Sequence, residues 1–131
     1  MKKLLLAAAM LLCTALATKA QTVIDNQTNC NIMVIQICYN AACIPVSTAA
    51  HPVPANTNYT IPIPCPAGYI TVYNVCWDEP GCMGTCATVE GSPYAGCGGG
   101  LYNVPLPPCV PCSPGGAIVD YDLVNDVLTI F

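Results

Sequence analysis

The chain has 131 residues, of which only three are basic, and all three lie within the first 20 positions (Lys2, Lys3 and Lys19). The remaining residues hold seven carboxylates and no lysine or arginine. They therefore carry no basic surface that could neutralise nucleic-acid phosphates or hold an anionic membrane. The same absence excludes a P-loop lysine, a Schiff-base lysine and an arginine clamp.

Residues 1–20 have the three-part pattern of a secretory signal peptide. Lys2 and Lys3 form a short positive start, residues 4–12 are apolar, and small or polar residues follow. The apolar run is shorter than the roughly 20 residues that a membrane-spanning helix needs. We expect cleavage after Ala20, with Ala17 as the alternative. Lipidation at Cys13 is less favoured, because Leu12 rather than a small residue precedes it.

This signal is of a bacterial type and predicts export across the inner membrane. We expect a secreted, extracellular or cell-surface protein, with the periplasm as a further possibility. No second apolar run is long enough to span a bilayer. The sequence therefore predicts a mature chain, residues 21–131, without a transmembrane segment.

The mature chain is dense in cysteine, which in a secreted protein indicates a disulfide scaffold. An even number permits five bridges, whose pairing stays open at this stage. Each bridge typically stabilises a fold by roughly 2–4 kcal/mol, mainly by restricting the unfolded chain. The ten candidates are Cys30, Cys38, Cys43, Cys65, Cys76, Cys82, Cys86, Cys97, Cys109 and Cys112.

Two other uses of these cysteines are weighed against the scaffold. The Cys109-x2-Cys112 spacing is that of a redox motif, but such motifs start a helix, whereas prolines surround this one. The same pair combined with Cys82-x3-Cys86 has spacing typical of zinc sites. Thiols tend to oxidise outside the cytoplasm, so we favour disulfides over both alternatives.

The branched side chains predict β structure, since valine and isoleucine far outnumber leucine after the signal. Alternation is clearest in residues 31–40 and 117–123. Pro62 and Pro64 mark the 59–63 segment as an edge strand. Asn125-Asp126 predicts a tight turn before a returning strand. In chain order the expected strands cover 22–26, 31–40, 44–47, 59–63, 69–77, 85–90, 101–104, 117–123 and 127–131.

Counting the short candidates among them, we expect seven or eight strands. Short strands with frequent turns predict a single all-β domain, a small disulfide-rich β-sandwich, with a partly open β-barrel as the alternative. Residues 78–116 are rich in glycine, proline and cysteine and predict an irregular insertion. That insertion is expected either to be a stapled connection or to carry a recognition surface. Residues 117–131 predict a terminal hairpin, and we expect the 127–131 strand to offer a free edge.

One candidate ligand site is Trp77-Asp78-Glu79. An aromatic ring can stack on a sugar face while a neighbouring acid accepts hydroxyl protons, and paired acids also hydrolyse glycosides. Adjacent residues of a strand point to opposite faces, however, which argues against Asp78 and Glu79 acting as a pair. Core packing of Trp77 is the plainer interpretation.

Three aspartates form the candidate metal site. Asp120 and Asp122 share one strand face and Asp126 lies across the turn, and carboxylate oxygens suit calcium. The spacing matches no complete calcium loop, so a solvated hairpin face is the plainer interpretation. No other cofactor is expected. The single histidine, His51, sits in a turn-like Ala-His-Pro context with no nucleophile elbow in the chain.

From these features we expect a non-enzymatic structural or surface-interaction protein, such as an adhesion module, that self-associates through strand edges. The alternative is an extracellular carbohydrate- or protein-binding module with a glycan or cell-surface partner. A small hydrolase that uses an acid pair is a remote third possibility.

Overall fold

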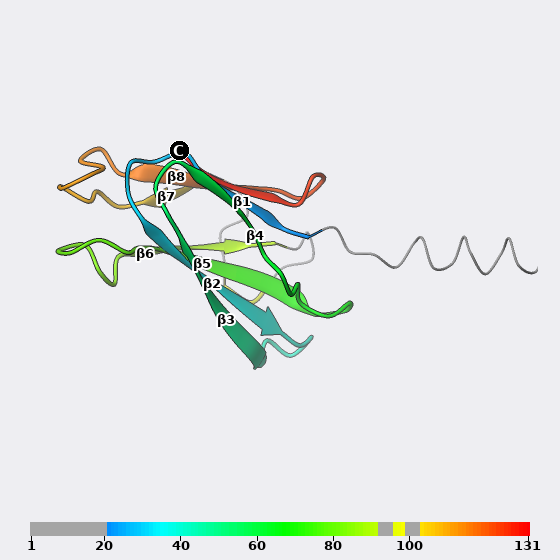
Figure 1. Cartoon of the computed structure of the whole chain (residues 1–131). Helices are drawn as coiled ribbons and strands as arrows, with labels where there is room; N and C mark the ends of the chain where they lie inside the picture. Colours follow the sequence, from blue (N-terminus) through cyan, green and yellow to red (C-terminus); the bar gives the residue numbers. More distant parts are fainter. Residues whose placement is uncertain (1–20, 92–95, 99–102) are drawn as a thin grey trace, which may run out of the picture.

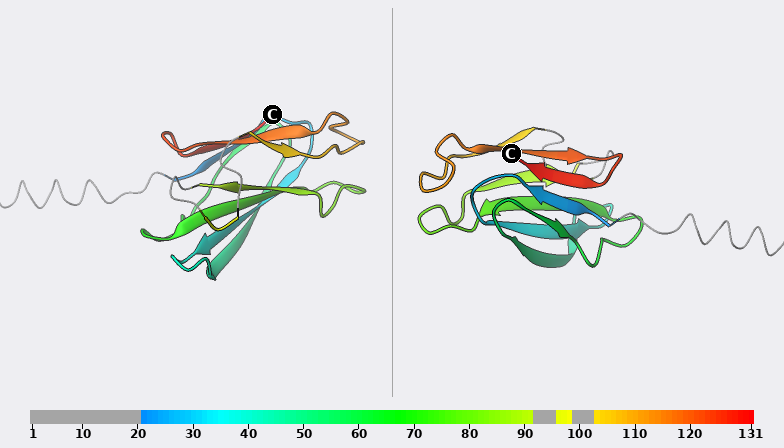
Figure 2. Two further views of the ribbon diagram at one scale, coloured as in Figure 1. Left: turned by 180° about the vertical axis from the view of Figure 1, so that it is seen from behind. Right: turned by 45° about the horizontal axis from the view of Figure 1, so that its top comes forward.

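The computed structural model describes residues 21–91, 96–98 and 103–131, which form two packed β-sheets without a helix (Figures 1 and 2). The five-stranded sheet has the order β4 (Thr57–Thr60), β1 (Val23–Asn26), β9 (Val127–Ile130), β8 (Ala117–Asp122), β7 (Val104–Leu106). The four-stranded sheet has the order β3 (Pro45–Val53), β2 (Ile32–Tyr39), β5 (Ile70–Trp77), β6 (Cys86–Glu90). The predicted disulfide-rich β-sandwich is confirmed, and the sheets do not close into a barrel.

The described strands number nine rather than the seven or eight expected, because the short segments stay separate. Among the described residues, no helix is long and apolar enough to cross a membrane. The expected strand at 101–104 is only partly tested, since 101 and 102 lie outside the described residues. Strand β7 covers the neighbouring positions within the irregular 78–116 region.

The period-two pattern of β2 explains how the core forms. Ile32, Val34, Gln36 and Cys38 are buried on the inner face, and the alternate residues are half-buried on the outer face. The inner face packs against buried residues of the other sheet, including Ile24 and Leu128. Such alternation is what a sheet buried chiefly on one face requires.

The pairing of β1 places the last strand in the middle of its sheet. Strand β1 pairs antiparallel with β4 and parallel with β9, while β9 also pairs antiparallel with β8. The predicted terminal hairpin is therefore confirmed. The expectation that 127–131 offers a free edge is wrong, because β1 covers the far side of β9.

Strand β3 is longer than the sequence suggested. The expected 44–47 strand runs from 45 to 53, so His51 lies in a strand rather than a turn and is buried. Pro45 and Pro52 argue against a strand of this length in the sequence. The structure accommodates them because β3 is an edge strand, where a missing N–H is tolerated.

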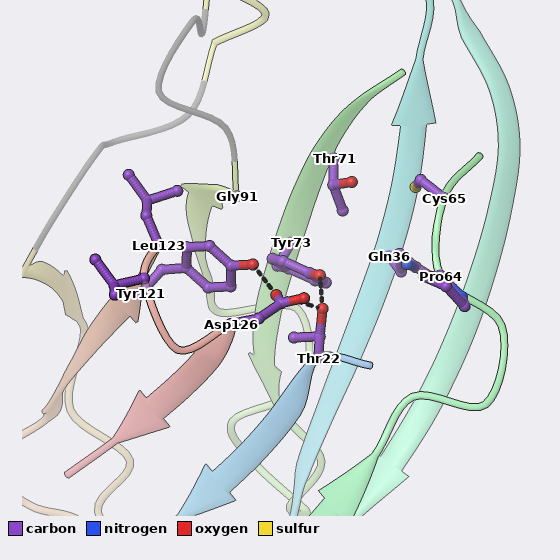
Figure 3. A pocket seen from close by; sticks show the side chains of 11 residues that line it. Thr22, Gln36, Pro64, Cys65, Thr71, Tyr73, Gly91, Tyr121, Leu123 and Asp126 are labelled. Carbon is purple, nitrogen blue, oxygen red and sulfur yellow. Dashed lines mark hydrogen bonds between the residues drawn. The ribbon is translucent and has the colours of Figure 1, made fainter. Parts of the chain in front are cut away.

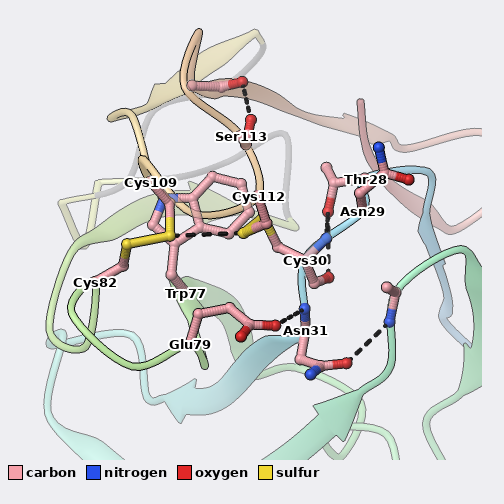
Figure 4. The surroundings of a disulfide bond; sticks show 12 residues. Thr28, Asn29, Cys30, Asn31, Trp77, Glu79, Cys82, Cys109, Cys112 and Ser113 are labelled. Carbon is pink, nitrogen blue, oxygen red and sulfur yellow. Dashed lines mark hydrogen bonds between the residues drawn. A yellow bond between two sulfur atoms is a disulfide. The ribbon is translucent and has the colours of Figure 1, made fainter.

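All ten mature cysteines pair, as predicted. The bridges are Cys30–Cys112, Cys38–Cys65, Cys43–Cys97, Cys76–Cys86 and Cys82–Cys109. The two cysteines of the Cys109-x2-Cys112 motif belong to different bridges, although their sulfurs lie only 3.6 Å apart (Figure 4). In this state neither carries the free thiolate that redox catalysis or zinc binding would use.

The paired bridges anchor the irregular region to the sandwich. Cys30, at the start of β2, and Cys82 both reach the 109–112 turn, and Cys30, Cys82 and Cys109 are buried in the core cluster. Trp77 belongs to the same cluster and donates its Nε1 hydrogen to the Pro107 carbonyl at 2.7 Å. This connection gives a segment rich in proline and glycine a fixed place on the sheets.

We predict unequal losses when single bridges are removed. Bridge Cys30–Cys112 joins residues 82 apart, and Cys76–Cys86 residues 10 apart. The loop-entropy relation gives about 4.5 and about 2.7 kcal/mol for these two separations. Replacing the first pair by alanine should therefore lower the free energy of unfolding by about 2 kcal/mol more than replacing the second, measured by urea denaturation. Equal losses would contradict this account.

Candidate functional site

A polar pocket opens at one end of the sandwich, between the two sheets (Figure 3). Its volume is about 240 Å³. The β8–β9 turn and β8 form one side, the segment that contains Pro64 forms the other, and β2 and β5 lie between them. The polar side chains that line it are Thr22, Gln36, Thr71, Tyr73, Tyr121 and Asp126.

Hydroxyl groups on one side of the pocket converge on the Asp126 carboxylate. Tyr121 donates to Asp126 Oδ1, and Thr22 donates to the same oxygen at 2.8 Å. Tyr73 Oη lies 2.8 Å from Thr22 Oγ1. A threonine hydroxyl has one proton, and Thr22 gives it to Asp126, so Tyr73 must be the donor to Thr22.

Burial keeps both tyrosines protonated at neutral pH. Desolvation raises the pKa of Tyr73 to about 12, with the nearby Asp126 carboxylate acting in the same direction. Desolvation also raises the pKa of Tyr121, and its neighbours Tyr73 and Asp126 add to the increase. The pocket therefore contains two neutral phenols and a single carboxylate.

Two further polar side chains lie in the pocket without a partner. Gln36 is 3% exposed and Thr71 is 7% exposed. Neither side chain makes a hydrogen bond to any described residue, yet both line the pocket. Buried polar groups are normally satisfied, and a pair that faces a cavity can be satisfied by what enters it.

Gly91 sets the width of the pocket beside the tyrosines. A Cβ built there would meet Tyr73 Cε2 at 2.9 Å and Tyr121 Cζ at 3.2 Å. The two rings themselves lie 5.5 Å apart, centre to centre, at a tilt of 36°. Only a residue without a side chain leaves these rings in place.

We predict that Gly91→Ala displaces the tyrosine rings and costs about 1–3 kcal/mol of unfolding free energy, the usual range for overpacking. The matched control is Gly115→Ala, where a Cβ meets no atom within 4 Å. Urea denaturation of both variants tests the difference. An unchanged midpoint for Gly91→Ala would show that the rings give way freely.

The three aspartates proposed for calcium do not converge. Asp122 accepts hydrogen bonds from the backbone N–H of Val124 and of Asn125, which closes the turn and lowers its pKa, with the side chain of Asn125 contributing most. Asp120 accepts from the Asn103 N–H at 3.3 Å. Among the described residues, cysteines form the only cluster with metal-ligand spacing. The aspartates thus serve as separate hydrogen-bond acceptors.

The segment Trp77-Asp78-Glu79 is divided between the core and a turn. Trp77 is 1% exposed, so its ring presents no open face. Glu79 accepts the backbone N–H of Asn31 at 2.8 Å, and the Asp78 N–H donates to the Asn31 carbonyl (Figure 4). Both acids are half-buried. These hydrogen bonds therefore attach the segment to the backbone at the start of β2.

His51 is held in the interior of β3. Its Nδ1 lies 3.4 Å from the Tyr59 hydroxyl, and its Nε2 is buried without a partner among the described residues. Burial lowers the pKa of His51 below its ordinary value. Neutral imidazole is therefore the form that the fold stabilises.

We predict that this histidine makes stability depend on pH. Because the pKa is lower in the folded than in the unfolded state, the unfolded chain binds the proton first as pH falls below about 6.5. Stability should be full above that value and decrease toward pH 5.5. His51→Phe keeps a ring beside Tyr59 and should flatten the dependence, as measured by urea midpoints between pH 7.5 and 5.5. An equal slope in the variant would show that a group other than His51 causes the pH dependence of stability.

The second surface feature is the free edge of β3. Residues 45–50 are all exposed, and Figure 1 shows β3 as the outermost strand of its sheet. Ser47 and Ala49 pair with Cys38 and Gln36, so they share the inner face. A mostly apolar hollow of about 250 Å³ lies there, bordered also by Ile63.

Comparison of the chain with protein-family models, curated proteins and solved structures finds no match.

The polar pocket was not predicted from the sequence. The sequence instead predicts its acid, Asp126, as a calcium ligand together with Asp120 and Asp122. Gln36 offered a signal, since it is the polar member of an otherwise apolar inner face of β2. Thr22, Tyr73 and Tyr121 come together only through the pairing of strands distant in the chain, which no local pattern reveals.

Proposed function

We propose that the protein is an exported, non-enzymatic interaction module that associates with a second copy of itself along β3. The observation that carries the proposal is the run of six exposed residues, 45–50, in the longest edge strand. An unpaired edge presents rows of backbone N–H and C=O groups that accept another strand. The five disulfides are compatible with an extracellular or other oxidising compartment.

The other edge strands are poorer candidates. Strand β4 has four residues and β7 has three, of which one is Pro105. Strand β6 has five, and its Glu90 accepts a hydrogen bond from the Cys97 N–H at 2.8 Å, which attaches the following segment to that strand. Among the described edge strands, only β3 combines a length of nine residues with a run of six exposed ones.

Charge favours a second copy at this edge. Every ionised side chain among residues 21–131 is a carboxylate, so most faces of two copies repel each other. Neither β3 nor its neighbour β2 contains a carboxylate, and the pKa of His51 is lowered. Two β3 edges can therefore approach without direct repulsion between like charges.

The hollow beside β3 supplies the side-chain part of such an interface. When a strand is added to a sheet edge, backbone hydrogen bonds supply affinity and pockets for alternate side chains supply specificity. Ile63 is 77% exposed at this hollow, and Val46 is 49% exposed on the strand itself. Antiparallel pairing of two β3 strands about a twofold axis would cover both and join the two four-stranded sheets.

The carbohydrate-binding alternative rests on Trp77, Asp78 and Glu79. It requires the Trp77 ring, now buried, to become available, whereas the two acids stay half-exposed. The acid-pair hydrolase would need the same two carboxyl groups, of which Glu79 is engaged by a backbone N–H. Both are therefore weaker proposals than association through β3.

A charge placed on β3 tests the proposal. We expect the mature, oxidised protein to dimerise reversibly in sedimentation equilibrium at pH 7. Thr48→Glu puts two like charges into the paired edges and should weaken the dimer at least about tenfold. Met83→Glu is the matched control, because it adds the same charge at a position 75% exposed outside β3.

The possible outcomes distinguish association through β3 from a general effect of net charge. A wild-type protein that stays monomeric at millimolar concentration would refute self-association. A dimer weakened equally by Thr48→Glu and Met83→Glu would assign the effect to net charge rather than to the edge. Circular dichroism of both variants checks that the fold is retained.

A further inference from the structure

The pocket between the sheets offers a candidate binding site that is distinct from the β3 edge. The hydroxyl protons of Thr22, Tyr73 and Tyr121 are used internally, since Tyr121 and Thr22 donate to Asp126 and Tyr73 donates to Thr22. What these groups still offer to a ligand is lone pairs. Asp126 Oδ2 adds a further acceptor, because no described residue donates to it.

We propose that this pocket binds a primary ammonium group on a short aliphatic stem. An ammonium brings three hydrogen-bond donors and a positive charge to a site that presents acceptors and one carboxylate. The described chain contains no lysine or arginine that could occupy the site itself. No lysine or arginine side chain of the described residues can therefore supply the cation.

The apolar residues that line the pocket fit the aliphatic stem of the proposed ligand. Leu123, Val124 and Pro64 provide apolar surface at the pocket, along with the Cys38–Cys65 bridge. Apolar contact of this kind suits methylene groups, as in the stem of a lysine side chain. The volume of about 240 Å³ lies below that of most drug-sized pockets, which indicates a ligand of a few non-hydrogen atoms.

Gln36 is the second, independent observation that points to a ligand. The residue is 3% exposed, lines the pocket, and its side chain has no hydrogen-bond partner in the described part of the chain. Figure 3 shows it across the pocket from Asp126 and Tyr121. Its carbonyl oxygen adds an acceptor for a donor-rich group, and Thr71 adds a hydroxyl.

A metal ion fits the same pocket less well. Calcium takes six to eight oxygen ligands and usually several carboxylates, whereas this site has one acid. The described carboxylates form no cluster of three around it. A neutral polyol would use the acceptors but would leave the charge of Asp126 uncompensated.

Titration of the folded, oxidised protein with n-butylammonium chloride, followed by backbone amide NMR, tests the proposal. We expect saturable shifts around Thr22, Tyr73 and Asp126, with affinity in the range of about 1–10 mM for so small a ligand. The isosteric neutral probe, n-butanol, should bind at least about tenfold more weakly at matched ionic strength.

Three variants distinguish binding at this pocket from a general effect of the protein's net charge. Asp126→Asn should weaken n-butylammonium binding at least about tenfold, and asparagine tolerates the positive φ of 57° at this position. Gln36→Met keeps the shape and should weaken binding several-fold. Asp25→Asn removes the same charge from the outer face of β1 and should leave affinity unchanged.

A further pair of probes distinguishes free amines from protein lysines. Nα-acetyl-lysine amide that binds as well as n-butylammonium would identify lysine side chains as ligands, and weaker binding would restrict the site to small free amines. The proposal is overturned if n-butanol binds as tightly as n-butylammonium, or if calcium chloride abolishes n-butylammonium binding at equimolar concentration. It is also overturned if Asp25→Asn weakens binding as much as Asp126→Asn does, or if no saturation occurs up to about 50 mM n-butylammonium.

Discussion

The absence of lysine and arginine from residues 21–131 is the constraint on which the rest of this structure depends. A carboxylate that leaves bulk water needs compensation, and no lysine or arginine of this part of the chain supplies it. Hydroxyl groups, backbone N–H groups and amides do so instead, and their geometry fixes the turns that contain the acids. Asp122 closes the β8–β9 turn, Glu79 holds the start of β2, and Glu90 holds the segment around Cys97. Even the one histidine is held neutral.

The same constraint explains why disulfides and not ion pairs connect distant segments. The bridges Cys30–Cys112 and Cys82–Cys109 attach the proline-rich 104–116 segment to the sandwich, and their sulfurs are in contact. Their count and their structural role were predictable from the cysteine density of a chain that begins with a predicted secretory signal. Their pairing was not, because it depends on which strands become neighbours.

The sequence predicts strands well where one face of a sheet is buried, as in β2 and β8, since burial on one face produces alternation. It fails for β3, whose residues 45–50 are exposed on both faces and so show no alternation. It predicts the strand β9 but not its place inside the sheet, because the parallel pairing with β1 joins segments that are distant in the chain. The pocket shares that limitation, since Thr22 and Asp126 meet through the same contact between distant segments.

The two surface features are physically adjacent, so the two proposed binding events would involve shared residues. Gln36 and Pro64 border both the polar pocket and the hollow beside β3. A shift of Gln36 on binding at one site would therefore change the lining of the other. Binding free energies coupled in this way are reciprocal, so an ammonium ligand that alters the β3 dimer must itself be bound differently by monomer and dimer. Gln36, the one polar residue on the inner face of β2, is the side chain through which such coupling would act.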